Sequence, residues 1–178
     1  MKKIWILIIV SIVVIGTGTW LLITTPAPEQ KIAEVSDYKN IAYEIDGRSV
    51  ALKDGFSETE AAPGSASKIT VRYFGNEVKG DFDANGTEDT AFLLTSDGGG
   101  SGTFYYVVLA LMGIDSYKGT NAVLLGDRIA PQTTEFKDGM IIVNYADRKP
   151  DEPMTTYPSV GVSKYLKVEN GALIETSQ

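Results

Sequence analysis

The pattern of hydrophobic and polar residues divides the chain into two parts. Residues 4–25 (IWILIIVSIVVIGTGTWLLITT) run for 22 positions without a charged side chain. From residue 41 on, short apolar runs alternate with polar and glycine-containing segments. A long uncharged run is typical of a membrane-spanning segment, whereas short runs separated by turn residues are typical of strands.

The first pattern predicts one transmembrane helix. At about 1.5 Å per residue, a helix over residues 4–25 crosses the roughly 30 Å hydrocarbon core of a bilayer. Trp5 and Trp20 lie near its two ends, where indole rings favour the membrane interface. The two lysines within residues 1–3 predict a cytoplasmic N-terminus. We therefore expect a single-pass protein of the cell membrane, with an extracytoplasmic C-terminal part.

A cleaved signal peptide is the alternative interpretation, and it would make the protein secreted. Its apolar region would span about 7–15 residues and end at an Ala-x-Ala-like site. The apolar run here is longer, and the small residues Thr25 and Ala27 are followed by Pro28, a poor arrangement for cleavage. Residues 26–40 begin with two prolines, which cannot continue a helix, and we expect them to form a stalk.

The second pattern predicts a mainly β domain over residues 41–178. Dipeptides that tolerate positive φ and close hairpins recur along it: Asp46-Gly47, Asp54-Gly55, Asp138-Gly139 and Asn170-Gly171. The runs between them are rich in Val, Ile, Thr, Tyr and Phe, and we expect strands at 41–45, 48–52, 68–74, 90–95, 103–112, 121–125, 132–136, 140–145, 159–168 and 172–175. The run 103–112 is apolar on both faces, which is typical of a central buried strand. The expected architecture is an antiparallel sandwich or a barrel-like fold.

The composition excludes whole classes of chemistry. The 178 residues include no histidine and no cysteine, so disulfides, thiolate nucleophiles, imidazole bases and Ser-His-Asp triads are ruled out. Acidic residues (23) outnumber basic ones (16), for a net charge of −7. Phosphate binding depends on Lys and Arg, so we expect no nucleic-acid partner. Cation binding by oxygen ligands, carboxylate-pair catalysis and Ser/Lys chemistry remain.

One segment, residues 81–89 (DFDANGTED), has the spacing of a cation-binding loop. Calcium takes six to eight oxygen ligands at about 2.3–2.6 Å. We expect the ligands at alternate positions: the side chains of Asp81, Asp83, Asn85 and Asp89 and the backbone carbonyl of Thr87. Glycine at the sixth position permits the sharp turn. A polar surface loop without an ion is the alternative.

This spacing resembles the D-x-D-x-[DN]-G loop of EF-hands, dockerins and FG-GAP/VCBS-type repeats. The full EF-hand signature requires Glu at position 12, where this chain has Phe92, and the flanking residues are strand-like. The closer resemblance is therefore to the strand-loop-strand form, D-x-D-x-[DN]-G-x-x-D. The missing bidentate Glu implies weak calcium binding, with a Kd of the order of 10⁻⁴–10⁻³ M, as in extracellular modules.

Longer stretches also resemble bacterial membrane-anchored or secreted proteins. They are GSGTFYYV, GTNAVLLGDRIAPQTT, VNYADR and PSVGVSKYLKV. The resemblance implies a location in the cell envelope and brings no catalytic residues with it.

Other segments offer weaker chemistry. Ser65-x-x-Lys68 resembles the nucleophile motif of penicillin-binding proteins and serine β-lactamases, but that motif needs a helix and Lys68 opens an expected strand. The glycine-rich segment 97–102 lacks the Gly-Lys-Ser/Thr of a phosphate-binding loop. Acidic residues of the polar loop 146–158 could act as a catalytic pair, although such residues are usually solvated.

We therefore expect a membrane-anchored binding or structural protein with a weak calcium loop and no catalytic activity. The membrane is one expected partner, through residues 4–25, and cell-wall glycan or another envelope protein is a further candidate. The alternative is an envelope hydrolase that uses a carboxylate pair or Ser65 with Lys68.

Overall fold

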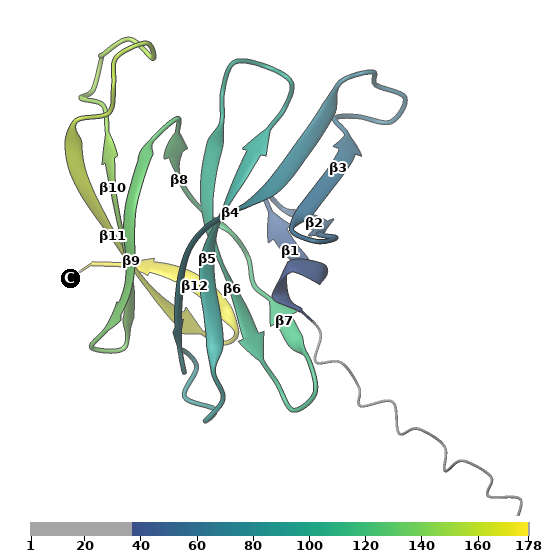
Figure 1. Ribbon diagram of the computed structural model, residues 1–178, viewed down its shortest axis with the longest axis vertical. Helices are drawn as coiled ribbons and strands as arrows, with labels where there is room; N and C mark the ends of the chain where they lie inside the picture. The colour runs from purple at the N-terminus through teal and green to yellow at the C-terminus, as the bar shows by residue number, and fades with distance from the viewer. Residues whose placement is uncertain (1–36, 178) are drawn as a thin grey trace, which may run out of the picture. The chain divides into compact units, whose positions relative to one another are not determined.

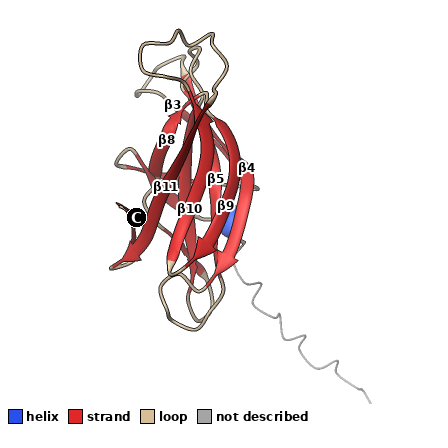
Figure 2. Cartoon of the chain, turned by 90° about the vertical axis from the view of Figure 1, so that its left-hand side faces the viewer, coloured by secondary structure: helices blue, strands red, loops and turns tan. Residues whose placement is uncertain are grey.

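The computed structural model describes residues 37–177. They form one short 3-10 turn and twelve strands in antiparallel sheets (Figure 1), and nearly all the regular structure is strand (Figure 2). The elements are η1 (Tyr38–Asn40), β1 (Ala42–Ile45), β2 (Arg48–Ala51), β3 (Phe56–Glu60), β4 (Lys68–Gly80), β5 (Asp89–Asp97), β6 (Phe104–Met112), β7 (Tyr117–Gly119), β8 (Val123–Asp127), β9 (Ala130–Lys137), β10 (Met140–Asp147), β11 (Val160–Glu169) and β12 (Ala172–Thr176). The prediction of a mainly β, sandwich-like domain is confirmed.

The four predicted turn dipeptides all adopt the left-handed backbone that a tight hairpin needs. Both residues of each pair have positive φ, for example 50° at Asp46 and 72° at Gly47. These turns join β1 to β2, β9 to β10 and β11 to β12, and the Asp54-Gly55 turn leads from β2 into β3. The local chemistry of Asp-Gly and Asn-Gly therefore sets the hairpin registers.

The largest sheet has the order β3-β4-β5-β6-β7, with β8 also paired to β6. Its centre is β5 and β6, where Ala91–Leu94 and Val107–Ala110 are fully buried. The expected central strand at 103–112 is β6, so that prediction is confirmed. A second sheet has the order β12-β11-β10-β9.

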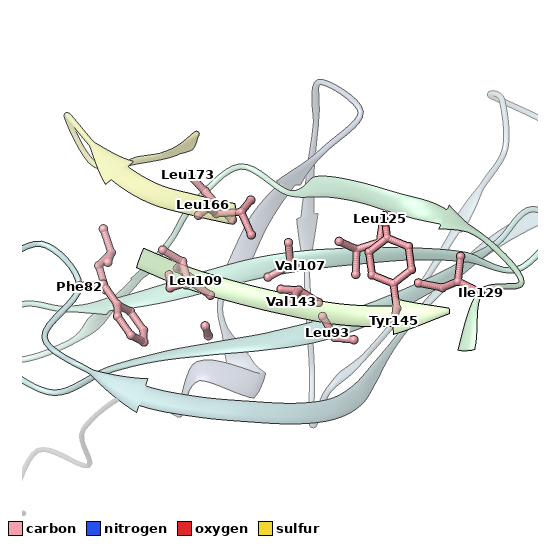
Figure 3. Close-up of a cluster of buried hydrophobic side chains, with 13 residues drawn as sticks. Phe82, Leu93, Val107, Leu109, Leu125, Ile129, Val143, Tyr145, Leu166 and Leu173 are labelled. Carbon is pink, nitrogen blue, oxygen red and sulfur yellow. The ribbon is translucent and has the colours of Figure 1, made fainter. Parts of the chain in front are cut away.

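The main hydrophobic core lies between these two sheets. Alternate residues of β5 and β6, such as Leu93 and Leu109, face Val143 of β10 and Leu166 of β11. Figure 3 shows their side chains pointing toward one another between the strands. Asn121 adds a polar link, because its side chain donates to the carbonyl of Leu173 at 2.9 Å and accepts from the N–H of Leu173 at 2.8 Å. It satisfies backbone groups of β12 that would otherwise lack a partner.

The opposite face of the six-stranded sheet carries a second core. Phe92 and Leu94 of β5 pack there with Tyr43 and Ile45 of the β1–β2 hairpin. The hairpin is held at its β1 edge, where the Glu44 N–H donates to the carbonyl of Thr120 at 3.1 Å. The hairpin therefore covers part of this face.

Two strands were not expected from the sequence. They are β3 (FSETE), which is mostly polar, and β7 (YKG), which has only three residues. The folded part also includes Tyr38, which lies in the expected stalk at 26–40 and whose ring contacts Phe92 and Tyr117.

The expected helix at 4–25 lies outside the described residues. Within residues 37–177 there is no helix long and apolar enough to cross a bilayer.

Candidate metal centre

The predicted cation loop connects β4 to β5. It begins after Gly80, the last residue of β4, and ends at Asp89, the first residue of β5. Ala84 and Gly86 both have positive φ, at 60° and 87°. These two left-handed residues turn the backbone sharply enough to bring both ends of the loop together.

Three carboxylates of this loop converge. Asp81, Asp83 and Asp89 place one oxygen each within 4.8 Å of the other two. Among the described residues they form the one group of at least three acidic side chains that is close enough to hold a metal ion. Like charges at this separation repel, so the arrangement needs either hydrogen-bond donors or a cation to stabilise it.

Backbone N–H groups supply part of that stabilisation. The two carboxylate oxygens of Asp81 accept from the N–H groups of Asn85 at 3.0 Å and Gly86 at 2.9 Å. Asp83 accepts from the Asn85 N–H at 3.2 Å. These bonds fold the loop around Asp81.

Asp89 is the buried member of the group, with no exposed surface. Its two oxygens accept from the N–H of Phe82 at 2.9 Å and the N–H of Met112 at 2.7 Å. Burial raises the pKa of Asp89 above its ordinary value, although the two N–H donors pull it the other way. The nearby charges of Asp83 and Asp81 raise the pKa further. A cation among the three carboxylates would favour the ionised form of Asp89.

Asn85 and Thr87 were also predicted ligands, Asn85 by its side chain and Thr87 by its carbonyl. The Asn85 Oδ1 accepts from the N–H of Thr87 at 2.7 Å, and the Asn85 Nδ2 donates to the carbonyl of Met112 at 2.9 Å. The Thr87 hydroxyl donates to that carbonyl at 2.6 Å. Both side chains thus tie the loop to the end of β6, and the three carboxylates form the candidate ion site.

Glu88, the remaining acid of the loop, lies outside the group. Its carboxylate forms an exposed ion pair with Lys79 at 3.1 Å. It is therefore a useful comparison for the other carboxylates, because it shares their loop and charge but contacts a different group.

The role of Met112 could not be read from the loop itself. Its N–H binds Asp89 and its carbonyl accepts from two loop side chains, yet it lies 23 residues after Asp89. The antiparallel register of β5 and β6 pairs Thr90 with Ala110, which brings Asp89 to the end of β6. A correct pairing of the two predicted strands could have revealed this contact.

The Ser65/Lys68 motif does not have the geometry of a nucleophile on a helix. Ser65 lies in the loop before β4 and its hydroxyl oxygen accepts from the N–H of Ser67 at 3.1 Å. Lys68 is the first residue of β4 and pairs with Glu60 at 3.5 Å. Ser65 and Lys68 therefore do not share a helix face, and the Lys68 ammonium has Glu60 as its ion-pair partner.

The other segments serve as connections. In the loop between β5 and β6, Asp97 accepts from the N–H of Gly99 at 2.7 Å. In the loop between β10 and β11, Arg148 donates to the carbonyl of Thr156 at 2.6 Å, and Glu152 accepts from the N–H of Lys149 at 3.0 Å. These contacts organise the loops internally.

Comparisons of this chain with protein-family models, with curated proteins and with solved structures give no match.

Proposed function

We propose that this chain is an envelope protein, held in the cell membrane by residues 4–25, whose extracytoplasmic β domain binds calcium weakly and has a binding or structural role without catalysis. The observation that supports calcium binding is the convergence of Asp81, Asp83 and Asp89, with Asp89 buried. Three carboxylates that repel one another in the folded loop gain stability when a divalent cation lies among them.

The donor set favours calcium over the transition metals. The loop offers oxygen ligands, since the sequence has neither histidine nor cysteine. Ca²⁺ accepts oxygen ligands in irregular geometry, whereas Mg²⁺ demands near-ideal octahedral geometry. Position 12 is Phe92, which is fully buried in the second core and supplies no ligand. We therefore expect an affinity of the order of 10⁻⁴–10⁻³ M, as in extracellular modules.

The expected consequence of the ion is local. Asp89 joins the loop to β6 through the N–H of Met112, so the loop contacts three successive strands, β4, β5 and β6. An ion that neutralises the carboxylates stabilises this end of the sheet.

Thermal unfolding of the full chain in detergent tests the calcium site. We expect about 5 mM CaCl₂, relative to EDTA, to raise the melting temperature of the wild type, since a ligand at several times its Kd stabilises the folded state by mass action. Asp83→Ala should abolish the rise, because it removes one of the three carboxylates, and among residues 37–177 Asp83 hydrogen-bonds only to Asn85 of the same loop.

Glu88→Gln is the matched control, because it removes one negative charge from the same loop but outside the carboxylate group. It should retain the calcium-induced rise. A wild type that melts at the same temperature in both buffers would show that the loop binds no calcium.

A further inference from the structure

We propose that the groove between the β1–β2 hairpin and the six-stranded sheet binds an extended peptide segment with apolar and basic side chains, as an added strand on β2. Such a peptide would be the ligand in the binding role proposed above, and this proposal rests on that role. It does not depend on calcium, because the groove shares no residue with the loop at 81–89.

The groove consists of two adjoining pockets of about 520 and 370 Å³. The first lies between β2, with Ser49 and Val50, and the sheet, with Thr59 and Ile69. The second extends along the sheet past Ile69 to Phe104. Both pockets are lined by Asp46, Ile69 and Ser96, so they form one continuous site.

The groove exists because the hairpin covers only part of the sheet face. Beyond it, apolar side chains of β6 and β8 stay exposed: Phe104 is 40% exposed and Leu124 is 45% exposed. Together with Ile45, Val50 and Ile69 they give the groove an apolar lining along much of its length. An apolar lining with a few polar groups is typical of binding sites.

Backbone groups on the outer edge of β2 have no hydrogen-bond partner within residues 37–177. In the hairpin, Glu44 of β1 is opposite Ser49 of β2. The Glu44 N–H and carbonyl bond away from β2, to Thr120 and Ala122. Glu44 and Ser49 are therefore a non-hydrogen-bonded pair, and the N–H and carbonyl of Ser49 also point away from β1, toward the free edge. A strand edge beside an apolar groove suits strand addition by a peptide.

Three charged side chains line the groove: Asp46 at its centre, and Arg48 and Glu60 in the first pocket, where Glu60 is paired with Lys68. The Asp46 carboxylate is the group that selects a basic side chain in the peptide. Asp46, where the two pockets meet, accepts from the buried Tyr106 hydroxyl at 2.8 Å through Oδ2, and its second oxygen has no partner among the described residues. A lysine or arginine of the peptide can form a charge-assisted hydrogen bond with this oxygen. Apolar side chains at alternate positions of the same strand then contact the lining.

A direct binding measurement tests this proposal. The probe is the heptapeptide Val-Thr-Val-Thr-Lys-Thr-Val, acetylated at its N-terminus and amidated at its C-terminus. A fluorescent derivative of this peptide is titrated with the full chain in detergent. We expect saturable binding that is equal in calcium and in EDTA. Methylation of the peptide's backbone nitrogens should abolish binding, because strand addition requires these N–H groups.

Two variants separate the features of the groove. Ser49→Pro removes the outward N–H on an edge strand, where proline is tolerated, and should abolish binding. Asp46→Asn keeps the hairpin turn, since Asn-Gly also closes such turns, but should weaken binding about tenfold. A probe with norleucine in place of lysine should bind equally well to Asp46→Asn and to the wild type. Asp138→Asn is the matched control, an Asp-Gly turn with the same left-handed backbone in another hairpin, and should bind like the wild type.

The proposal is wrong if the wild type does not bind the probe, or if the methylated probe binds as well as the parent. It is also wrong if the chain self-associates and Ser49→Pro makes it monomeric, because the occupant is then a second copy of the chain. An absent peptide signal with a preserved calcium-induced rise in melting temperature would reject the groove alone. A peptide signal without the calcium effect would reject the ion site alone.

Discussion

At the scale of single residues, the most unusual group is the buried carboxylate of Asp89. It has no exposed surface, lies near two further carboxylates and yet accepts two backbone hydrogen bonds. Its pKa is raised chiefly by burial. The sequence spacing predicted it as a ligand, but its burial follows from its position at the start of β5 beside the end of β6.

The raised pKa of Asp89 predicts how the calcium effect depends on pH. A raised folded-state pKa means that the protonated form contributes stability at low pH and that this contribution is lost as pH rises through the folded-state pKa. Protons and calcium therefore compete for the same carboxylate. The calcium-induced rise in melting temperature should shrink as pH falls from 7.5. This decrease should begin at a pH above 3.8, the ordinary pKa of aspartate.

Thermal unfolding in paired calcium and EDTA samples between pH 7.5 and 4 measures this effect. Glu88→Gln should give the same pH profile as the wild type. A calcium effect that stays constant down to pH 4 would contradict the role of Asp89.

At the scale of elements, the hairpins follow from local sequence, whereas the two edge strands β3 and β7 do not. Asp-Gly and Asn-Gly pairs specify their turns by backbone preference alone, and the predicted strands beside them formed. By contrast, β3 carries two exposed glutamates and β7 only three residues, so neither has a hydrophobic pattern. They are strands because their backbones pair with the neighbouring strands β4 and β6. For example, Glu58 of β3 lies opposite Thr70 of β4.

The contact of β7 with β1 gives a prediction at this scale. A Cβ on Gly119 would lie 2.1 Å from the carbonyl oxygen of Ala42 and 2.8 Å from the ring of Tyr43. Backbone cannot move aside as a flexible side chain can, so Gly119→Ala should destabilise the domain by about 3 kcal/mol, the upper part of the range for overpacking.

Chemical denaturation of Gly119→Ala measures this loss in the free energy of unfolding. Gly161→Ala, in strand β11, is the control, because its Cβ would have no neighbour within 4 Å. Equal stabilities of the two variants would show that β7 does not pack tightly against β1.

At the scale of the whole molecule, the described residues form two main sheets that share a core, and the sheet face away from this core is only partly covered by a hairpin. The partial cover produces the groove, and the join of β4 to β5 produces the carboxylate group. Both proposed sites are therefore consequences of how elements far apart in the chain meet.

The proposed membrane anchor at residues 4–25 is tested on the whole protein. A native membrane fraction, washed with high salt and carbonate and then sequenced from the N-terminus, should contain a protein that starts at or near residue 1. A mature chain that starts near residue 28 and appears in the medium would show that the segment is a cleaved signal peptide.

The sequence by itself determined those features that depend on neighbours along the chain. They are the mainly β character, the four positive-φ turns, the double-faced apolar strand at 103–112 and the spacing of the acidic loop, because backbone preference and side-chain alternation act over a few residues. Only the tertiary structure decided the burial of Asp89, the tie to Met112, the strands β3 and β7 and the groove at Asp46. Each of these depends on pairing between segments that no local pattern specifies, since a strand edge or a buried position is created by its distant partner.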